Sequence, residues 1–164
     1  MALLTACTLL TGCSSSGGST PDSQPVADQK QAVVGLGSAE QVAAYLEQQI
    51  STMSTKTVYT AATDPDHLLG KPDGYRSKVA FTDSRVQPGQ VDGASASPVD
   101  LGGIIETFAT SGDARSRAAH LQSTLKGLSA AEYHYYVGGS LVRVSRILTP
   151  DQVEDYQAAA ESLG

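Results

Sequence analysis

Residues 133–144, which read YHYYVGGSLVRV, carry the clearest structural signal in the chain. The aromatic and branched side chains of residues 133–137 suit a strand whose successive side chains point to opposite faces. Gly138 and Gly139 form the kind of two-residue turn that closes a tight hairpin, and apolar residues resume over 141–144. The stretch therefore predicts a β-hairpin, and with it an antiparallel sheet.

Helix signals lie on both sides of this hairpin. Downstream, the sequence TPDQ at 149–152 combines a capping threonine, a proline in the first turn and a capping-box glutamine, which predicts a helix to about residue 163. Upstream, apolar residues recur at helical spacing over 112–127. Nearer the start of the chain, Ser38 opens a third helix, predicted over 39–53.

Three more segments are β-prone, at 57–60, 77–83 and 104–109. Along the chain the predicted elements follow the order α, β, β, β, α, β, β, α. Two long connections rich in proline and glycine, 61–76 and 84–103, separate the early strands. We expect an α+β fold: a small antiparallel sheet of four to five strands with about three helices packed mainly on one face.

The chain has 164 residues, 40% of them hydrophobic, which is enough for one domain with a core. Its formal net charge is −6, with 17 acidic against 11 basic residues. Nucleic-acid binding needs a basic face, so this balance argues against nucleic acid as a partner. It also argues against attachment to a membrane through a basic patch, so any attachment has to be covalent or through an apolar segment.

The first residues, MALLTACTLLTGC, have the organisation of an export signal. Residues 2–12 are apolar or small and uncharged, and these 11 residues are too few to span a bilayer, for which about 20 are needed. They match the length of the hydrophobic segment of a signal peptide. The run ends in Leu10-Thr11-Gly12-Cys13, which resembles the lipobox of bacterial lipoproteins: an aliphatic residue, two small residues and a cysteine.

The resemblance implies that a peptidase cleaves between Gly12 and Cys13 and that the Cys13 thiol carries a diacylglyceryl group. Two acyl chains, at about 0.8 kcal/mol per buried CH₂, hold a protein stably on a membrane. The segment ending in Cys7 also fits the pattern, but few residues precede it. Signal peptides normally begin with a positive charge, and no Lys or Arg precedes this apolar run, so a start upstream of Met1 remains an alternative. A second alternative is that residues 1–13 form a buried element of a cytosolic protein, although the run shows no helical or strand periodicity.

We therefore expect three parts: a signal peptide at 1–12, the lipidated cysteine with a flexible tether at 13–37, and a single α+β domain at 38–164. Residues 14–37 are rich in Ser, Gly, Pro, Gln and Asp, a composition typical of flexible linkers. A coil of 24 residues spans roughly 25–30 Å. The domain would then lie on the extracytoplasmic side of the cell membrane, clear of the lipid headgroups.

No established catalytic or metal-binding motif is present in the sequence. The chain lacks a G-x-S-x-G elbow, an H-E-x-x-H pair, a P-loop and a dinucleotide-binding fingerprint. Its three histidines, His67, His120 and His134, are too widely spaced to share a metal within one helix or strand. We expect no cofactor, and a binding function is favoured over an enzymatic one.

The most distinctive internal segment is DPDHLLGKPDGY at 64–75, followed by Ser77-Lys78. It resembles a segment of small lipoproteins and secreted proteins of actinobacteria. That segment combines Asp-Pro, Leu-Leu-Gly with a basic residue and proline, and then Tyr and Ser-Lys. The resemblance implies a family without implying an activity.

The segment has two physical interpretations. In the first, Leu68 and Leu69 fill part of the core, and the prolines and glycines shape the loop around them. In the second, its polar side chains converge as a rim for a ligand or a cation such as Ca²⁺, although the EF-hand spacing is missing. The candidate rim residues are Asp64, Asp66, His67 and Asp73.

The expected function is that of a membrane-anchored lipoprotein whose domain is a non-enzymatic binding or interaction module of the cell envelope. An envelope protein or a small ligand would contact the loops at 61–76 and 84–103. The alternative is an envelope hydrolase with an acid–base pair formed by Asp66 and His67. That activity requires the two side chains to reach each other in a cleft.

Overall fold

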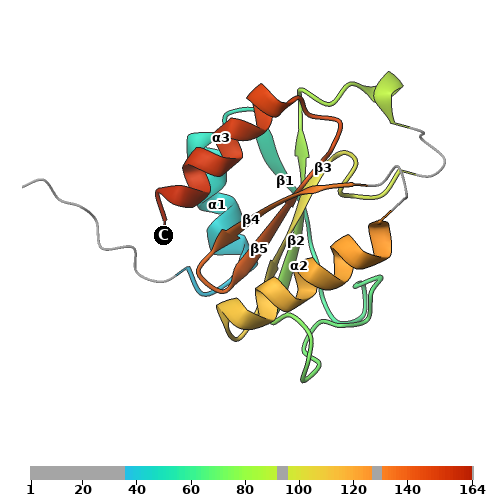
Figure 1. Ribbon diagram of the computed structural model, residues 1–164, viewed down its shortest axis with the longest axis vertical. Coiled ribbons are helices and arrows are strands. Elements are labelled where there is room, and N and C mark those ends of the chain that lie inside the picture. Colours follow the sequence, from blue (N-terminus) through green and yellow to red (C-terminus); the bar gives the residue numbers. More distant parts are fainter. Residues whose placement is uncertain (1–35, 92–95, 127–130, 164) are drawn as a thin grey trace, which may run out of the picture. The chain divides into compact units, whose positions relative to one another are not determined.

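A computed structural model describes residues 36–91, 96–126 and 131–163. Gly12, Cys13 and almost the whole predicted tether lie outside the described residues. Among the described residues, no helix is long and apolar enough to cross a membrane. In chain order the elements are α1 (Ala39–Gln49), β1 (Met53–Val58), β2 (Ser77–Asp83), a short 3₁₀ helix (Pro88–Gln90), β3 (Gly102–Thr107), α2 (Ser111–Leu125), β4 (Tyr133–Val137), β5 (Ser140–Val144) and α3 (Pro150–Glu161) (Figure 1).

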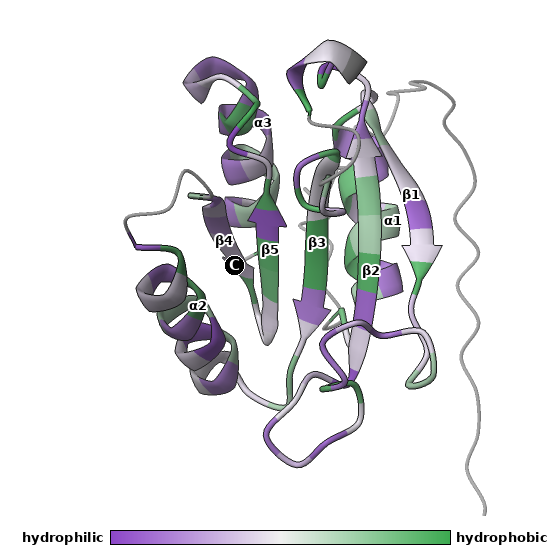
Figure 2. Cartoon of the chain, turned by 90° about the vertical axis from the view of Figure 1, so that its right-hand side faces the viewer, coloured by the Kyte–Doolittle hydropathy of each residue, from purple (hydrophilic) through white to green (hydrophobic). Residues whose placement is uncertain are grey.

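The strands form one sheet in the order β1-β2-β3-β5-β4, and every neighbouring pair is antiparallel. The central strands β2, β3 and β5 carry most of the sheet's hydrophobic residues, as Figure 2 shows. β1 and β4 form the two edges. Within the described residues, three α-helices and an antiparallel sheet of five strands confirm the predicted α+β class.

Helices cover both faces of the sheet. α1 and α3 pack on one face, where the larger apolar core lies, while α2 and the connection between β1 and β2 cover the other (Figure 1). The side chains of β2 alternate between the two faces of the sheet. Val79 and Phe81 belong to the larger core, whereas Lys78 and Ala80 point to the opposite face. Two of the three helices therefore share a face, and α2 lies opposite them.

The first helix ends earlier than its apolar spacing predicts. α1 stops at Gln49 rather than near residue 53, and β1 begins at Met53 rather than at 57. Ile50 and Met53 are buried, but a tight turn brings them into the core. The Ile50 N–H bonds to the Leu46 carbonyl, and the Met53 N–H bonds to the Ile50 carbonyl. Such a turn keeps the apolar spacing of a helix without continuing the helix.

The hairpin joins β4 and β5 through the predicted turn. Val137 pairs with Ser140 across Gly138 and Gly139. Gly138 has a φ of 54°, in the left-handed region that glycine adopts without strain. α3 begins, as predicted, at a capping box on Thr149.

Candidate functional site

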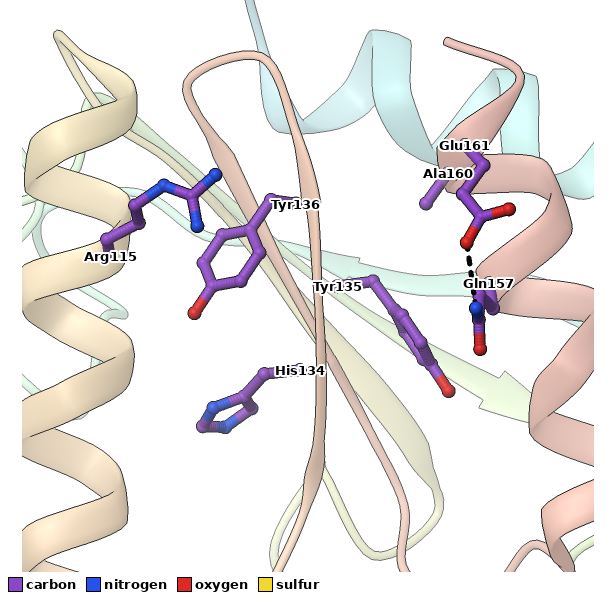
Figure 3. A pocket seen from close by; sticks show the side chains of 7 residues that line it. All are labelled: Arg115, His134, Tyr135, Tyr136, Gln157, Ala160 and Glu161. Atoms are coloured by element: carbon purple, nitrogen blue, oxygen red, sulfur yellow. Dashed lines mark hydrogen bonds between the residues drawn. The ribbon is translucent and has the colours of Figure 1, made fainter. Parts of the chain in front are cut away.

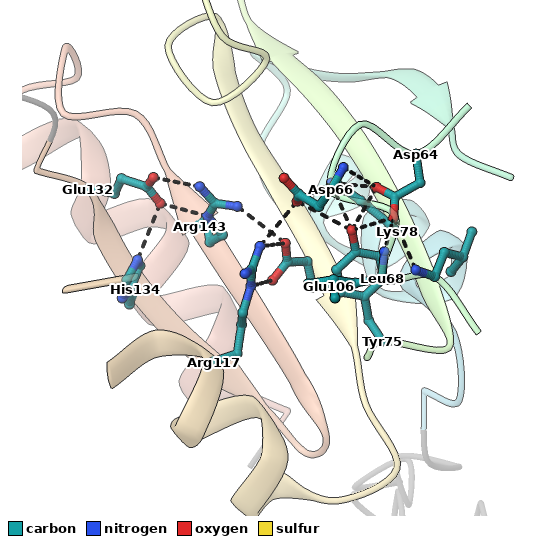
Figure 4. A network of polar contacts seen from close by, with 11 residues as sticks. Asp64, Asp66, Leu68, Tyr75, Lys78, Glu106, Arg117, Glu132, His134 and Arg143 are labelled. Carbon is teal, nitrogen blue, oxygen red and sulfur yellow. Dashed lines mark hydrogen bonds and ion pairs between the residues drawn. The ribbon is translucent and has the colours of Figure 1, made fainter. Parts of the chain in front are cut away.

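Asp64 is the centre of the loop segment singled out in the sequence. Its side chain is fully buried, and its carboxylate accepts hydrogen bonds from the N–H groups of Leu68 (2.8 Å) and Leu69 (3.0 Å). It also accepts from the Tyr75 hydroxyl (2.6 Å) and the Lys78 ammonium (2.9 Å) (Figure 4). Backbone, phenol and ammonium donors together hold this loop in one shape.

Lys78 is the buried cation opposite Asp64, and it is 1% exposed. Its Nζ also donates to Asp66 (2.7 Å) and to the Tyr75 hydroxyl (3.1 Å), and it lies 5.0 Å from the centre of the Tyr59 ring. Burial alone would raise the pKa of Asp64. The hydrogen bonds from Tyr75 and Lys78 outweigh it and hold that pKa well below its usual range.

Ion pairs continue from this point across the second face of the sheet. Arg117 of α2 binds Asp66 (3.1 Å) and also Glu106 on β3 (3.0 Å). Glu106, which is 0% exposed, pairs in turn with Arg143 on β5 (3.2 Å), and Arg143 reaches Glu132 (2.6 Å). We call this continuous set of contacts the charged row. Its members are Asp64, Lys78, Asp66, Arg117, Glu106, Arg143, Glu132 and His134 (Figure 4).

Every carboxylate of the charged row has a cationic partner. Burial raises the pKa of Glu132, but hydrogen bonds from Arg143 and from His134 (3.3 Å) outweigh it and lower that pKa to about 2. Burial also opposes ionisation of Asp66, and the bond from Lys78 again leaves its pKa lowered. A general base works best with a pKa near the working pH, so Asp66 and Glu132 are poor proton acceptors at neutrality. The charged row therefore fits the structural interpretation of the loop segment.

The structure brings only two of the four predicted rim residues into contact with one partner. Asp64 and Asp66 meet at Lys78, whereas His67 and Asp73 are exposed. Asp73 borders a separate open cavity of about 370 Å³ between the loop and α2. In the parts of the chain that the structure describes, no group of three or more His, Cys, Asp and Glu residues is arranged to hold a metal ion.

A larger open groove, of about 590 Å³, runs along the free edge of β4. We call it the β4 groove. On β4, His134 and Tyr136 point toward α2, whereas Tyr135 points toward α3 (Figure 3). Because these side chains lie on opposite faces of the strand, the groove extends around the edge of the sheet. Its walls are Arg115 of α2 and, from α3, Gln157, Ala160 and Glu161.

The two walls of the β4 groove differ in charge. On the α2 side, the Arg115 guanidinium lies 4.6 Å from the centre of the Tyr136 ring, a cation–π distance. On the α3 side, Gln157 donates a hydrogen bond to the Glu161 carboxylate (2.7 Å). The groove therefore offers a cation on one wall, an anion on the other, and tyrosine rings between them.

The sequence-based site predictions do not include the β4 groove. Alternation over 133–137 identifies a strand, but the position of that strand at an edge depends on the pairing of β3 with β5. The available signal is weak: the strand lacks the lysine and proline that commonly protect sheet edges.

No family model matches this chain, and no match was found among curated proteins or solved structures. The class of this protein therefore rests on its structure. The described residues form a small α+β domain with the charged row on one face and the β4 groove at one sheet edge.

Proposed function

We propose that this chain is a membrane-anchored extracytoplasmic lipoprotein whose α+β domain is a binding module of the cell envelope. The β4 groove is the observation that carries the binding part of the proposal. Ligand sites are concave, combine aromatic side chains with a few polar groups, and have volumes of about 300–1,000 Å³. The β4 groove, at about 590 Å³ with two tyrosines, an arginine and a glutamate, has these properties.

The lipid anchor on Cys13 supplies the location of the module. An uncharged apolar segment, the box at Leu10-Thr11-Gly12-Cys13 and a linker-like composition over 14–37 follow one another in the order that export and lipidation require. Two acyl chains on one sulfur would hold the domain at the membrane surface without a spanning helix.

Substitution of Cys13 tests the anchor. In a bacterial host, we expect the wild-type chain to partition with membranes and to have the intact mass of residues 13–164 plus acyl groups. Cys13→Ser should remove both properties. Cys7→Ser should change neither, because Cys7 leaves with the signal peptide. An unmodified wild-type chain that still begins at Met1, found among soluble contents, would refute the anchor.

A photo-crosslinking amino acid at Gln157 tests the β4 groove in living cells. Gln157 is exposed in the wall of the groove, and Glu40, exposed on α1, provides the control position. We expect a discrete adduct from Gln157 that disappears when Arg115→Glu is added, and no adduct from Glu40. Equal labelling at the two positions, or none at either, would contradict binding in the groove.

The hydrolase alternative has weaker support. Asp66 is engaged by Lys78 and Arg117, and its pKa is lowered. Among the hydrogen bonds of the described residues, none joins it to the His67 side chain. A general acid–base pair needs mutual reach and a base whose pKa lies near the working pH. The lowered pKa of Asp66, and its lack of a described hydrogen bond to His67, meet neither condition.

A further inference from the structure

The two edges of the sheet are built differently. β1 carries Lys56 and a β-bulge between Thr55 and Thr57, and both features discourage the addition of a further strand. β4, with the sequence YHYYV, contains neither lysine nor proline, and its pairing with β5 has no register shift. β4 therefore presents a regular edge of the kind that accepts another strand.

The hairpin geometry identifies the backbone groups of β4 that face outward. In an antiparallel pair, opposed residues alternate between hydrogen-bonded and non-hydrogen-bonded pairs. The pair that closes the two-residue turn, Val137 with Ser140, is hydrogen-bonded. Counting back from it, His134 and Tyr136 fall in non-bonded pairs, so their N–H and C=O groups point away from β5. Among the described backbone hydrogen bonds outside helices and strands, none involves these groups.

The flanking helices restrict what can reach this edge. α2 and α3 lie on opposite faces of β4, and residues of both line the β4 groove (Figure 3). A second copy of the domain, paired edge to edge in either orientation, would bring its own two helices against these walls. A single extended segment would bring none. Building on the binding function above, we propose that the β4 groove accepts an extended polypeptide segment of another protein as a sixth, antiparallel strand.

The charge of the two walls indicates the chemistry of that segment. Its side chains opposite His134 and Tyr136 face α2 and meet Arg115, which favours acidic residues there. The side chains between them face α3 and meet Glu161, which favours basic residues. The Tyr135 ring offers apolar surface to the stem of a long basic side chain. The groove thus fits a strand in which acidic and basic side chains alternate.

Synthetic peptides test strand addition directly. The protein is the isotope-labelled full chain with Cys7→Ser and Cys13→Ser, which carries no lipid. The probe is an end-capped eight-residue peptide that alternates glutamate with lysine, and the control peptide has four glutamates followed by four lysines. We expect the alternating peptide to slow amide hydrogen exchange at His134 and Tyr136 and the control peptide to leave it unchanged. No slowing by the alternating peptide would overturn the proposal.

Backbone methylation separates strand pairing from charge attraction. In an antiparallel strand, the residues opposite His134 and Tyr136 donate their N–H groups to β4, and in the probe these residues are the glutamates. N-methylation of the glutamates should weaken binding about tenfold or more, because it removes these hydrogen bonds. N-methylation of the lysines should leave the affinity nearly unchanged. Equal effects of the two modifications, or none from either, would overturn the proposal.

A charge reversal tests the α2 wall. Arg115→Glu should remove the preference for the alternating peptide, while Arg146→Glu, at an exposed position outside the groove, should preserve it. Thermal unfolding of both variants checks that the fold is intact. An unchanged preference in folded Arg115→Glu would contradict the placement of the acidic side chains against the α2 wall.

Two other occupants would also overturn the proposal. Faster exchange at His134 and Tyr136 after deletion of residues 14–35 would assign the groove to this chain's own tether. A concentration-dependent dimer that protects the same amides would assign it to a second copy. Strand addition can fail while the binding function holds. An adduct from Gln157 with a ligand that is not a polypeptide would support binding in the groove and exclude only strand addition.

Discussion

Asp64 holds the long connection between β1 and β2 against the sheet, because four donor groups lie within 3.0 Å of its buried carboxylate. Lys78 depends in return on Asp64 and Asp66, since an ammonium group buried without a counter-ion is strongly destabilising. At the scale of single residues, this pair determines the conformation of the loop segment.

Asp64→Asn should lower the free energy of unfolding by about 3–5 kcal/mol, because it removes one partner of a buried ion pair and leaves Lys78 with Asp66 alone. Asp73→Asn, an exposed change in the same loop, should alter that free energy by less than about 0.5 kcal/mol. Urea denaturation followed by circular dichroism measures both variants. Equal losses would show that the Asp64 charge has no special role.

The polar residues of this region could be predicted from the sequence, but their contacts could not. Alternation in SKVAFTD places Lys78 on the face opposite Val79 and Phe81. Its bond to Asp64, however, joins residues 14 positions apart, and the bond from Arg117 to Asp66 spans 51 positions. Contacts between residues so far apart in the sequence depend on the order of the strands and on where the helices pack. Local sequence patterns carry no information about either.

Among the elements, those specified by neighbouring residues form where the sequence predicts them. The hairpin, the strand at 77–83 and the start of α3 have their predicted positions, because turn glycines, alternation and a capping box each act within a few residues. The boundary between α1 and β1 was predicted wrongly, since Ile50 and Met53 keep helical spacing in a turn. The edge position of β4 depends on a long-range pairing and has only a weak local signal.

Gly138→Ala should destabilise the hairpin by about 1–2 kcal/mol, because its φ of 54° is strained for a residue with a Cβ. Gly89→Ala is the matched control: an added Cβ has open space at both positions, but only Gly138 has a positive φ. Thermal unfolding of the two variants compares them, and a similar loss at Gly89 would point to a cause other than backbone conformation.

For the molecule as a whole, the charged row links the loop, α2 and the hairpin across one face of the sheet. The same face contributes to the response to acid. Asp64, Asp66 and Glu132 have lower pKa values in the folded chain than in the unfolded chain. They contribute stability above their unfolded pKa, near 4, and this contribution is lost as the pH falls through the folded pKa.

We therefore expect the free energy of unfolding to fall steeply below about pH 4, as Asp64, Asp66 and Glu132 become protonated. Glu132→Gln should reduce the slope between about pH 4 and pH 2, because the folded pKa of Glu132 is about 2. Glu40→Gln, an exposed change on α1, should keep the wild-type slope. Denaturant titrations across this pH range measure the slope, and identical curves for the two variants would contradict the assignment.

The strand order also has a consequence for the sequence of events in folding. The sheet consists of two parts that are each contiguous in the chain, β1-β2-β3 and β4-β5, and a single ladder between β3 and β5 joins them. Nearby segments meet sooner than distant ones, so each part should form before the two associate. Their association must strip water from Glu106 and Arg143, which become buried together. In refolding followed by stopped flow, dehydration of this pair should limit the rate, and an apolar pair in its place should refold faster.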